Sequence, residues 1–246
     1  MKELFDNYYE EAFSQSKSQR LDLHSFELAA KKFRWNYRHF FQELPKDVAI
    51  LDYGCGIGQF LYFLKKEGFK NIIGIDVSKT QIDIAFKMQP DVDFRHVENA
   101  TKFLQENTEK YNVVVLNDVL EHIEVQNTIN LMKNIYNSIR PGGVVIIKTI
   151  NSAYPFGSSL RYIDMTHTTA FHKKSLIQLL RHVGFKDISY FQEEIGIYNF
   201  LFFLKKIVVF AVRIFVKLLI YFTECDWQDV ISLNLIVSGV KSKERL

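Results

Sequence analysis

The sequence predicts a doubly wound α/β fold built on a mainly parallel sheet. From residue 48 to residue 150, short apolar runs alternate with segments of helical periodicity. Such strict alternation favours parallel strands joined by right-handed helical crossovers, with helices on both faces of the sheet. The chain has 246 residues, of which 48% are hydrophobic and 24% charged. This balance is typical of a globular protein with one sizeable core.

The predicted elements follow in order along the chain. A helical segment with apolar residues at helical spacing, "SFELAAKKFRWNYRHFFQEL", has no helix breaker until Pro45. Gly68 is suited to the left-handed position that ends the second helix. The predicted helices are 25–44, 59–69, 79–89 and 127–140, and the predicted strands are 48–54, 71–77, 92–97, 111–119, 143–150, 185–194 and 232–241.

Charge and cysteine content limit the possible functions. The formal net charge is only +3, so nothing demands a nucleic-acid partner, which usually requires a strong basic excess. The two cysteines are too few for a disulfide framework. The first residues, "MKELFDNYYEEAF", lack the basic-then-apolar order of a secretory signal. We therefore expect a cytoplasmic protein that does not bind nucleic acid.

A glycine-rich loop follows the first predicted strand in "ILDYGCGIGQF". Gly54, Gly56 and Gly58 alternate there, and glycine lets the chain turn tightly while a ligand approaches the backbone. The stretch does not match the dinucleotide pattern G-x-G-x-x-G, because Gln59 or Leu61 stands where the third glycine should be. Asp52 ends the strand, and a carboxylate there suits a ligand that carries a positive ammonium or sulfonium.

Asp76 ends the second predicted strand, 22 residues after Gly54. A carboxylate at this place can accept hydrogen bonds from both hydroxyls of a ribose. The alternative is an ordinary helix cap before "SKTQ". The glycine loop upstream favours ribose binding.

Four motifs together carry a resemblance to a known family. They are "ILDYGCGIG", "IIGIDVS", "NDVLEHI" and "RPGGVVIIKT". In this order and spacing the chain resembles the class I S-adenosylmethionine-dependent methyltransferases, over roughly residues 30 to 240. The resemblance implies a seven-stranded Rossmann-like sheet whose last two strands are an antiparallel pair. It also implies S-adenosylmethionine as cofactor and S-adenosylhomocysteine as product.

The resemblance implies a role for several residues of the cofactor site. Asp52 and the loop Gly54, Cys55, Gly56 and Gly58 would surround the methionine part. Asp76, followed by Val77, would hold the ribose. Asn117 and Asp118, after the fourth strand, would lie beside the point of methyl transfer.

The segment "ENA", residues 98 to 100, departs from the family pattern. The family usually has an aspartate here that contacts the adenine amino group. This chain has Asn99, followed by Ala100, and the carbonyl of an asparagine can accept the same hydrogen bond.

The loop after the fifth strand, residues 151–176, is long and polar, as binding loops often are. Within "RYIDMTH", Arg161, Asp164 and His167 recur every three residues, so a helical turn would project them in similar directions. His167 could act as the base for an acceptor hydroxyl, Asp164 could orient it, and Arg161 could bind a phosphate or carboxylate. The alternative is that His167 and Asp164 only fasten the loop to the next helix.

His122, in "LEHI", is a second candidate catalytic residue, although such a histidine often packs beneath the cofactor. No cluster has the spacing of zinc ligands, and we expect no metal. A magnesium-assisted transfer that uses Asp118 is possible in principle, but nothing in the sequence indicates it.

An apolar stretch lies between the last two predicted strands, at residues 197–228. Its longest uncharged run has only ten residues, 195–204, which is too short to span a membrane. Lys206, Arg213 and Lys217 would share one stripe of a helix whose other faces are apolar. Such a helix suits the surface of an anionic membrane, through residues 198–222. The alternatives are a homodimer contact and a cover over the protein's own core.

We therefore expect a helical cap at residues 1–44 and a methyltransferase domain at 45–246 that carries the insertion. The loop and the basic-apolar helix resemble methyltransferases of bacterial surface-polysaccharide synthesis, which implies O-methylation of a sugar hydroxyl on a surface or lipid-linked glycan. The alternatives are a prenylated quinone precursor or other small molecule, and a non-catalytic module that binds the cofactor. The expected location is cytoplasmic, with peripheral contact at the inner face of the membrane.

Overall fold

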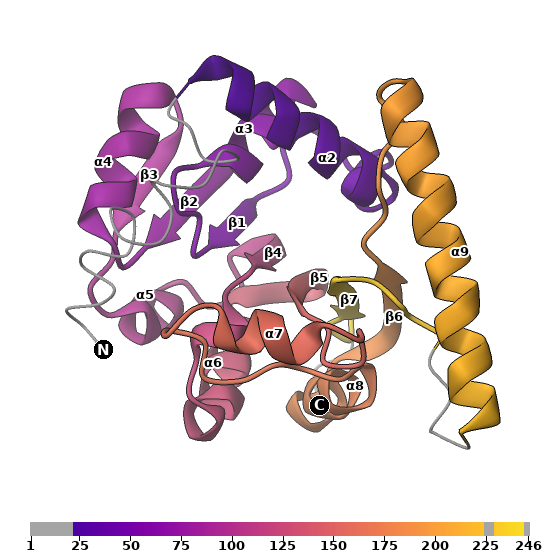
Figure 1. Ribbon diagram of the computed structural model, residues 1–246. Coiled ribbons are helices and arrows are strands. Elements are labelled where there is room, and N and C mark those ends of the chain that lie inside the picture. The colour runs from indigo at the N-terminus through magenta and orange to yellow at the C-terminus, as the bar shows by residue number, and fades with distance from the viewer. Residues whose placement is uncertain (1–21, 224–228, 244–246) are drawn as a thin grey trace.

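A computed structural model describes residues 22–223 and 229–243, and within them a seven-stranded sheet forms the centre of the molecule (Figure 1). The strand order is β3-β2-β1-β4-β5-β7-β6. Strands β1 to β5 are parallel, and β7 runs antiparallel to both β5 and β6. The doubly wound prediction is confirmed, and each predicted strand is present. Their bounds are β1 Ile50–Tyr53, β2 Ile72–Asp76, β3 Asp93–His96, β4 Tyr111–Asn117, β5 Ile139–Ile150, β6 Lys186–Gln192 and β7 Asn234–Val240.

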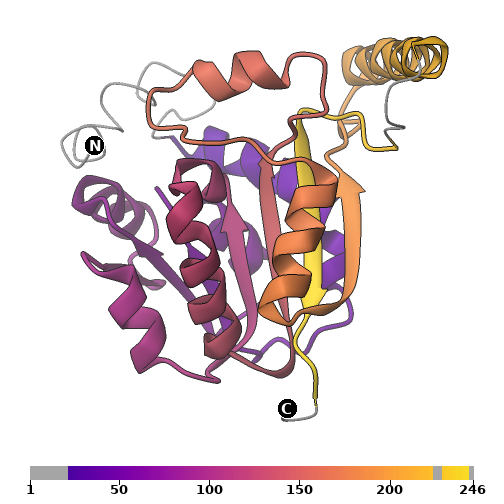
Figure 2. The same ribbon diagram turned by 90° about the horizontal axis from the view of Figure 1, so that it is seen from below.

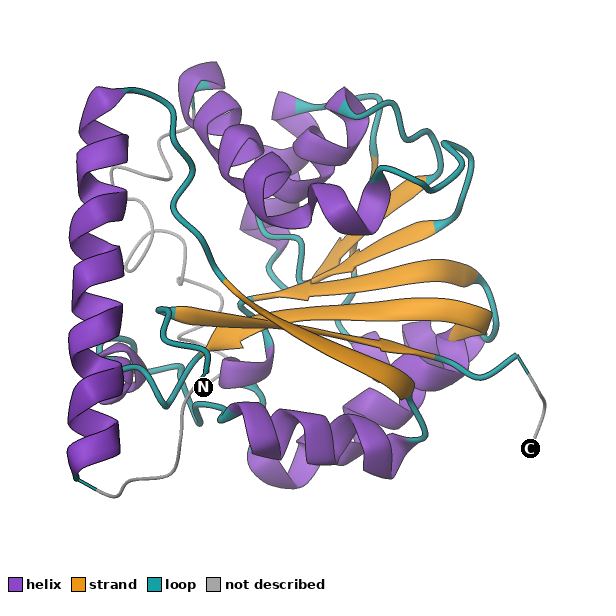
Figure 3. Ribbon diagram, turned by 90° about the vertical axis from the view of Figure 1, so that its right-hand side faces the viewer, coloured by secondary structure: helices purple, strands orange, loops and turns teal. Residues whose placement is uncertain are grey.

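Helices cover both faces of the sheet, as Figure 3 shows. Helices α2 (Leu23–Phe41) and α3 (Gln59–Lys66) contribute to the apolar cluster on one face. Helices α5 (Ala100–Glu106), α6 (Val125–Ser138) and α8 (Lys173–Val183) contribute to the cluster on the other. Helix α4 (Lys79–Met88) lies beside β2 and β3. Gly68 has φ +89°, which confirms the left-handed end predicted for α3.

The N-terminal segment joins the same core as the sheet. Helix α2 begins where the Asp22 carboxylate accepts a hydrogen bond from the Ser25 N–H, 2.7 Å away, a typical N-cap. Tyr37 and Phe41 are fully buried and contact the Phe60 ring of α3. The helix predicted at 25–44 is thus confirmed as α2, whereas residues 1–21 of the expected cap lie outside the described residues.

The carboxyl ends of β1, β2, β4 and β5 meet at one edge of the sheet. The order reverses between β1 and β4, the position at which open α/β sheets bind ligands. The short helix α7 (Gly157–Tyr162) and the long helix α9 (Phe200–Phe222) lie beyond this edge (Figure 2). A single 3-10 turn, η3 (Leu120–His122), follows β4.

Helix α9 lies in the predicted insertion between β6 and β7. Of that insertion, residues 197–228, the last five (224–228) lie outside the described residues. Two residues of the basic stripe of α9, Lys206 and Arg213, face the protein, and the expected membrane contact stays a prediction. Arg213 pairs with Glu194 at 2.7 Å, and the Lys206 ammonium lies 5.2 Å from the centre of the Trp35 ring. Across residues 22–223 and 229–243, we find no helix with the length and apolar character that crossing a membrane requires.

Candidate active site

The loop between β1 and α3 can be built only from glycine at its three alternating positions. Gly54, Gly56 and Gly58 have φ values of +73°, +53° and +83°, a region that side chains with a Cβ rarely adopt. A Cβ at Gly58 would also come 2.6 Å from Cζ of Phe94, and one at Gly54 would come 2.6 Å from Cγ2 of Val119. The loop therefore presents bare backbone at the carboxyl end of β1.

A cavity of about 600 Å³ opens beside this loop. It runs along the carboxyl ends of β1, β2 and β4 and continues to the α7 loop. Most of the predicted cofactor residues line it: Asp52, Gly54, Cys55, Gly56, Asp76, Val77, Ala100, Asn117 and Asp118. Both predicted catalytic residues, His122 and His167, line it as well.

Three buried polar atoms on residues that line this cavity find no hydrogen-bond partner among the residues that the structure describes. They are Oδ1 of Asp52, Nε2 of Gln59 and Nδ2 of Asn117. Buried polar groups are nearly always paired, so each such atom needs an explanation. The set contains one carboxylate acceptor and two amide donors, and it could serve a ligand that carries an ammonium and a carboxylate.

The two acids of the site differ in their partners. Asp52 is 1% exposed, and burial together with the nearby Asp76 raises its pKa to about 8. Asp76 accepts hydrogen bonds from the backbone N–H of Gly56 at 2.9 Å and of Ser78 at 2.8 Å. These bonds tie the glycine loop to the end of β2. Burial raises the pKa of Asp76 as well, although the two backbone donors partly oppose it.

An ion pair and a hydrogen bond fix the end of β4. Asp118 has φ +56° and pairs with the buried Lys148 of β5, with 2.6 Å between Oδ2 and Nζ. Burial alone would lower the pKa of Lys148, but Asp118 and Glu193 outweigh it and raise that pKa. The Tyr37 hydroxyl donates to Oδ1 of Asn117. Tyr37 thereby orients the Asn117 amide, because Nδ2 becomes the end without a partner.

Two histidines lie together at the far end of the cavity, with 4.7 Å between the ring centres of His122 and His167. Nδ1 of His167 lies 3.0 Å from the carbonyl oxygen of Leu160. A carbonyl oxygen only accepts, so Nδ1 carries the proton in the neutral ring and Nε2 is the basic nitrogen. His167 thus has its basic nitrogen fixed by a backbone contact.

His122 is held by a chain of hydrogen bonds from the same loop. Thr166 donates its hydroxyl proton to Oδ1 of Asp164 at 2.7 Å, so Nδ1 of His122 must donate to that hydroxyl across 2.8 Å. Burial and the neighbouring His167 lower the pKa of His122 to about 4. The ring is therefore neutral at physiological pH.

Arg161 and Asp164, which were predicted to bind the substrate, lie outside the cavity lining. Helix α7 ends at Tyr162, so the expected helical turn does not carry Arg161, Asp164 and His167 on one face. Arg161 donates to the Thr168 carbonyl at 2.6 Å, and Asp164 also accepts the Thr166 backbone N–H at 2.8 Å. Neither lines the cavity. Both make hydrogen bonds within the loop, and their expected role in acceptor binding stays a prediction.

The role expected for Asn99 stays a prediction. Its side-chain carbonyl caps α5 and accepts the Lys102 N–H at 2.9 Å, and Asn99 itself does not line the cavity. Its neighbour Ala100 does line it.

Sequence reasoning missed several residues of the site. Glu121 is 1% exposed, lines the cavity and accepts the Thr149 hydroxyl proton at 2.8 Å. Burial and Asp118 raise the pKa of Glu121 to about 8. Its place inside "NDVLEHI" could have drawn attention to it. Phe33 lines the cavity from α2, but nothing in the sequence separates it from the other core aromatic residues of that helix.

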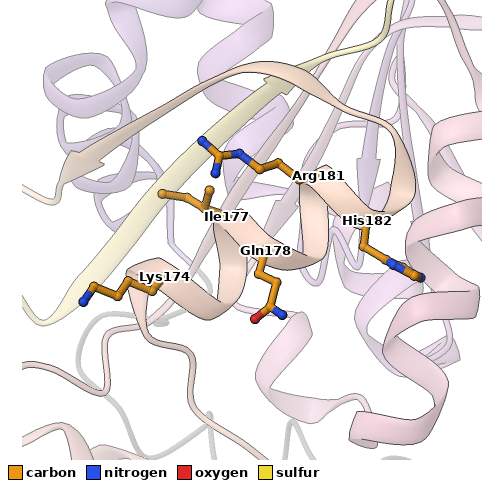
Figure 4. Close-up of a pocket in the computed structure, with 5 residues that line it drawn as sticks. All are labelled: Lys174, Ile177, Gln178, Arg181 and His182. Atoms are coloured by element: carbon orange, nitrogen blue, oxygen red, sulfur yellow. The ribbon is translucent and has the colours of Figure 1, made fainter.

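A second hollow, of about 570 Å³, lies over α8 (Figure 4). Its lining side chains are Lys174, Ile177, Gln178, Arg181 and His182. All five come from one helix, so they do not converge from different elements on a common point. We assign no ligand to this hollow.

Comparison with known proteins identifies the family. The sequence model of a family described as a methyltransferase domain matches residues 26–190, more than half of the chain. The chain belongs to this family. Solved structures show the same fold for this methyltransferase. An S-adenosylmethionine-dependent methyltransferase from Archaeoglobus fulgidus has a TM-score of 0.66 at 18% identity, covering 95% of this chain and 98% of that one.

A second solved structure contains the cofactor. Phosphoethanolamine N-methyltransferase 2 of Haemonchus contortus, in complex with S-adenosylmethionine, has a TM-score of 0.59 at 15% identity and covers 97% of this methyltransferase and 60% of that chain. At such low identities the two structures show a shared fold. S-adenosylmethionine is the cofactor bound in that complex.

Curated relatives match a shorter part of the methyltransferase. The ubiquinone biosynthesis O-methyltransferase of Rickettsia bellii is 36% identical over 107 residues, which is 43% of each chain. That of Rickettsia typhi is 36% identical over 115 residues, 45% of each chain. The methyltransferase therefore matches less than half the length of these relatives.

The cavity fits this cofactor chemically. The orphaned Asp52 carboxylate oxygen can accept from its ammonium, while the amide donors of Gln59 and Asn117 can serve its carboxylate. Asp76 retains lone pairs for ribose hydroxyls besides the two backbone bonds that it accepts. The glycine loop leaves room for the ligand against bare backbone. When bound, the cofactor supplies an electrophilic methyl group on a sulfonium sulfur.

Proposed function

We propose that this methyltransferase transfers the methyl group to a phenolic hydroxyl of an apolar aromatic acceptor, of the class of prenylated quinone precursors. The observation that carries the proposal is the composition of the cavity beyond the cofactor loop. Apolar side chains of Ile150, Leu160, Ile163 and Leu233 line that part together with the two histidines. A flat apolar ring with one reactive hydroxyl suits such a lining.

His167 is the residue that would take the proton. The attack needs a base within hydrogen-bond reach of the hydroxyl, and Nε2 of His167 is the basic nitrogen because Nδ1–H donates to the Leu160 carbonyl. As the oxygen forms its bond to the methyl carbon, the hydroxyl proton passes to Nε2. The bound cofactor would supply the methyl group and keep the electron pair of its carbon–sulfur bond, and the His167 imidazolium would then release its proton to water.

His122 has a positioning role in this proposal. A group whose pKa is about 4 is a weak base near neutral pH. Its neutral ring contacts His167, and the chain through Thr166 to Asp164 holds it in place. His122 therefore keeps the His167 ring oriented.

The comparisons support this acceptor class over the glycan expected from the sequence. The matched relatives are named ubiquinone biosynthesis O-methyltransferases. The glycan expectation depended on a resemblance of the loop and the basic-apolar helix to methyltransferases of surface-polysaccharide synthesis. Arg161 and Asp164, the two residues expected to bind the acceptor, do not line the cavity. The acceptor class remains our proposal because the match covers less than half of each relative.

The experiment is an acceptor profile with the purified protein and labelled S-adenosylmethionine. The acceptors are a synthetic prenylated catechol, a polyprenyl-linked sugar and a short RNA. We expect label in the prenylated catechol, and at least a hundredfold slower transfer by His167→Ala with unchanged cofactor binding in calorimetry. Label in the sugar lipid or RNA instead would overturn the acceptor class. Cofactor binding without transfer to any of the three would also count against the proposal.

A further inference from the structure

Helix α9 presents an apolar outer face to its surroundings. None of its residues is buried, and Phe200, Phe215 and Phe222 are 72%, 60% and 76% exposed. We define the outer face by Phe200, Leu204, Val208, Phe215, Leu218 and Phe222, all more than 40% exposed. With 3.6 residues per turn, the exposed apolar residues cover roughly 200° of the helix circumference. So large an exposed apolar surface marks an interaction site.

Two charged residues of α9, Arg213 and Lys206, hold it against the body of the protein. Arg213 donates from Nη1 to Glu194 at 2.7 Å and from Nε to the Ile231 carbonyl at 2.8 Å. Lys206 lies on the same side of the helix, above the Trp35 ring. These contacts fix the rotation of the helix, so the apolar arc must point away from the protein.

A second apolar patch lies at the same edge of the sheet. The patch consists of Phe156, Tyr162, Ile163 and Met165, on α7 and the residues that flank it, and these side chains are between 63% and 85% exposed. Figure 2 shows α7 and α9 beyond the carboxyl ends of the parallel strands, and Figure 1 looks onto this edge with both helices in front. The outer face of α9 and the patch at α7 therefore lie on the same side of the molecule, although they belong to different elements.

We propose that the outer face of α9 and the α7 patch together dock on the surface of a lipid bilayer, with α9 lying flat in the interface. A bilayer surface is flat and extended, and a helix at that interface buries its apolar face about 5–10 Å deep. A second copy of the chain fits less well. A two-helix seam buries a narrow stripe of two residues in seven, which would leave most of the 200° arc and the α7 patch exposed.

The docking surface adjoins the cavity. Ile163 is 77% exposed and also lines the cavity, so the cavity mouth lies at the proposed membrane plane. An acceptor carried by the lipid phase would then reach the site without crossing water. The docking proposal does not depend on the acceptor class, because it concerns only the apolar surface and its charges.

The test is flotation of the full chain with vesicles of phosphatidylcholine, with and without phosphatidylglycerol. The variant is Leu204→Glu/Phe215→Glu, which places two charges on the outer face. The matched control is Phe86→Glu/Ile129→Glu, on α4 and α6, where the side chains are 55% and 40% exposed against 42% and 60% for the tested pair. Calorimetry with S-adenosylmethionine shows that each variant is folded.

We expect the wild type and the control to float with neutral vesicles and the α9 variant to lose at least tenfold in partitioning. Phosphatidylglycerol should add less than threefold, because Lys206 and Arg213 face the protein. Equal flotation of the α9 variant and wild type would overturn the proposal. The proposal would also be overturned if the wild type did not bind vesicles and sedimented as a dimer, while the α9 variant sedimented as a monomer. Binding only to anionic vesicles would contradict the orientation of the helix.

Discussion

Replacing Asp52 by asparagine should stabilise the protein increasingly as pH rises. The Asp52 carboxyl is buried with a pKa of about 8, whereas an aspartate in the unfolded chain has a pKa of about 3.9. Between these values the folded state holds a proton that the unfolded state releases. The stability of the wild type therefore falls as pH rises through this window, and the asparagine variant lacks this loss.

The slope follows from linkage. One proton difference corresponds to about 1.4 kcal/mol per pH unit, so the free energy of unfolding of Asp52→Asn should gain about 3 kcal/mol on the wild type between pH 5.5 and 7.5. Asp76 and Glu121 also make the free energy of unfolding depend on pH, but they do so in both proteins, so their effects largely cancel in the difference between variant and wild type. The same variant should bind S-adenosylmethionine at least tenfold more weakly, because the Asp52 carboxyl can ionise to pair with the bound ammonium, whereas an amide cannot take up a charge.

Urea unfolding at a series of pH values measures the first effect, and calorimetry measures the second. Asp83→Asn is the control, because Asp83 is an exposed partner of Lys79 on α4. The difference in the free energy of unfolding between Asp83→Asn and the wild type should not change with pH. A difference for Asp52→Asn that is equally flat would refute the assignment of a protonated, buried Asp52.

Three further outcomes are expected. Gly58→Ala should weaken cofactor binding more than a hundredfold in calorimetry, because its Cβ would meet the Phe94 ring; an affinity within threefold of the wild type would contradict this. Arg213→Met should lower the free energy of unfolding in urea by about 2–3 kcal/mol, since the guanidinium bonds to Glu194 and to the Ile231 carbonyl are lost, and unchanged stability would mean that other contacts hold α9. Glu121→Gln should gain stability on the wild type from pH 5 to pH 8, given the Glu121 pKa of about 8; a variant less stable at pH 8 would contradict it.

The sheet could be predicted because its pattern is local. The run from Ile50 to Tyr53 is short and mostly apolar, contains Asp52 near its end and is followed by the glycine loop. In a parallel sheet, a loop at the carboxyl end of a strand is where ligands bind. The glycine loop, Asp52 and Asp76 were found in this way. The cofactor half of the site follows from residues that are adjacent in sequence.

The acceptor half depends on tertiary contacts that spacing does not encode. The three-residue intervals from Arg161 to His167 suggested one helical face, but α7 ends at Tyr162. His167 reaches the cavity because its ring contacts Leu160 and His122, while Arg161 turns back to Thr168. Which way a side chain leaves an irregular loop is decided by its partners.

The orientation of α9 could not be predicted from the sequence either. Its sequence predicts that Lys206, Arg213 and Lys217 share a stripe, but not whether the stripe faces water or protein. Glu194, two residues after the end of β6, decides this by pairing with Arg213. A helical pattern predicts the faces of a helix, and only the fold shows which face is covered.

The central claim, that His167 takes the proton from a phenolic acceptor, is tested most directly by single-turnover methyl transfer to the prenylated catechol across pH. A phenol ionises near pH 10. We expect His167→Ala to be at least a hundredfold slower than the wild type at pH 7 and to approach the wild-type rate near pH 10, where the acceptor needs no base. Equal rates at pH 7, or a deficit that stays constant up to pH 10, would contradict the account.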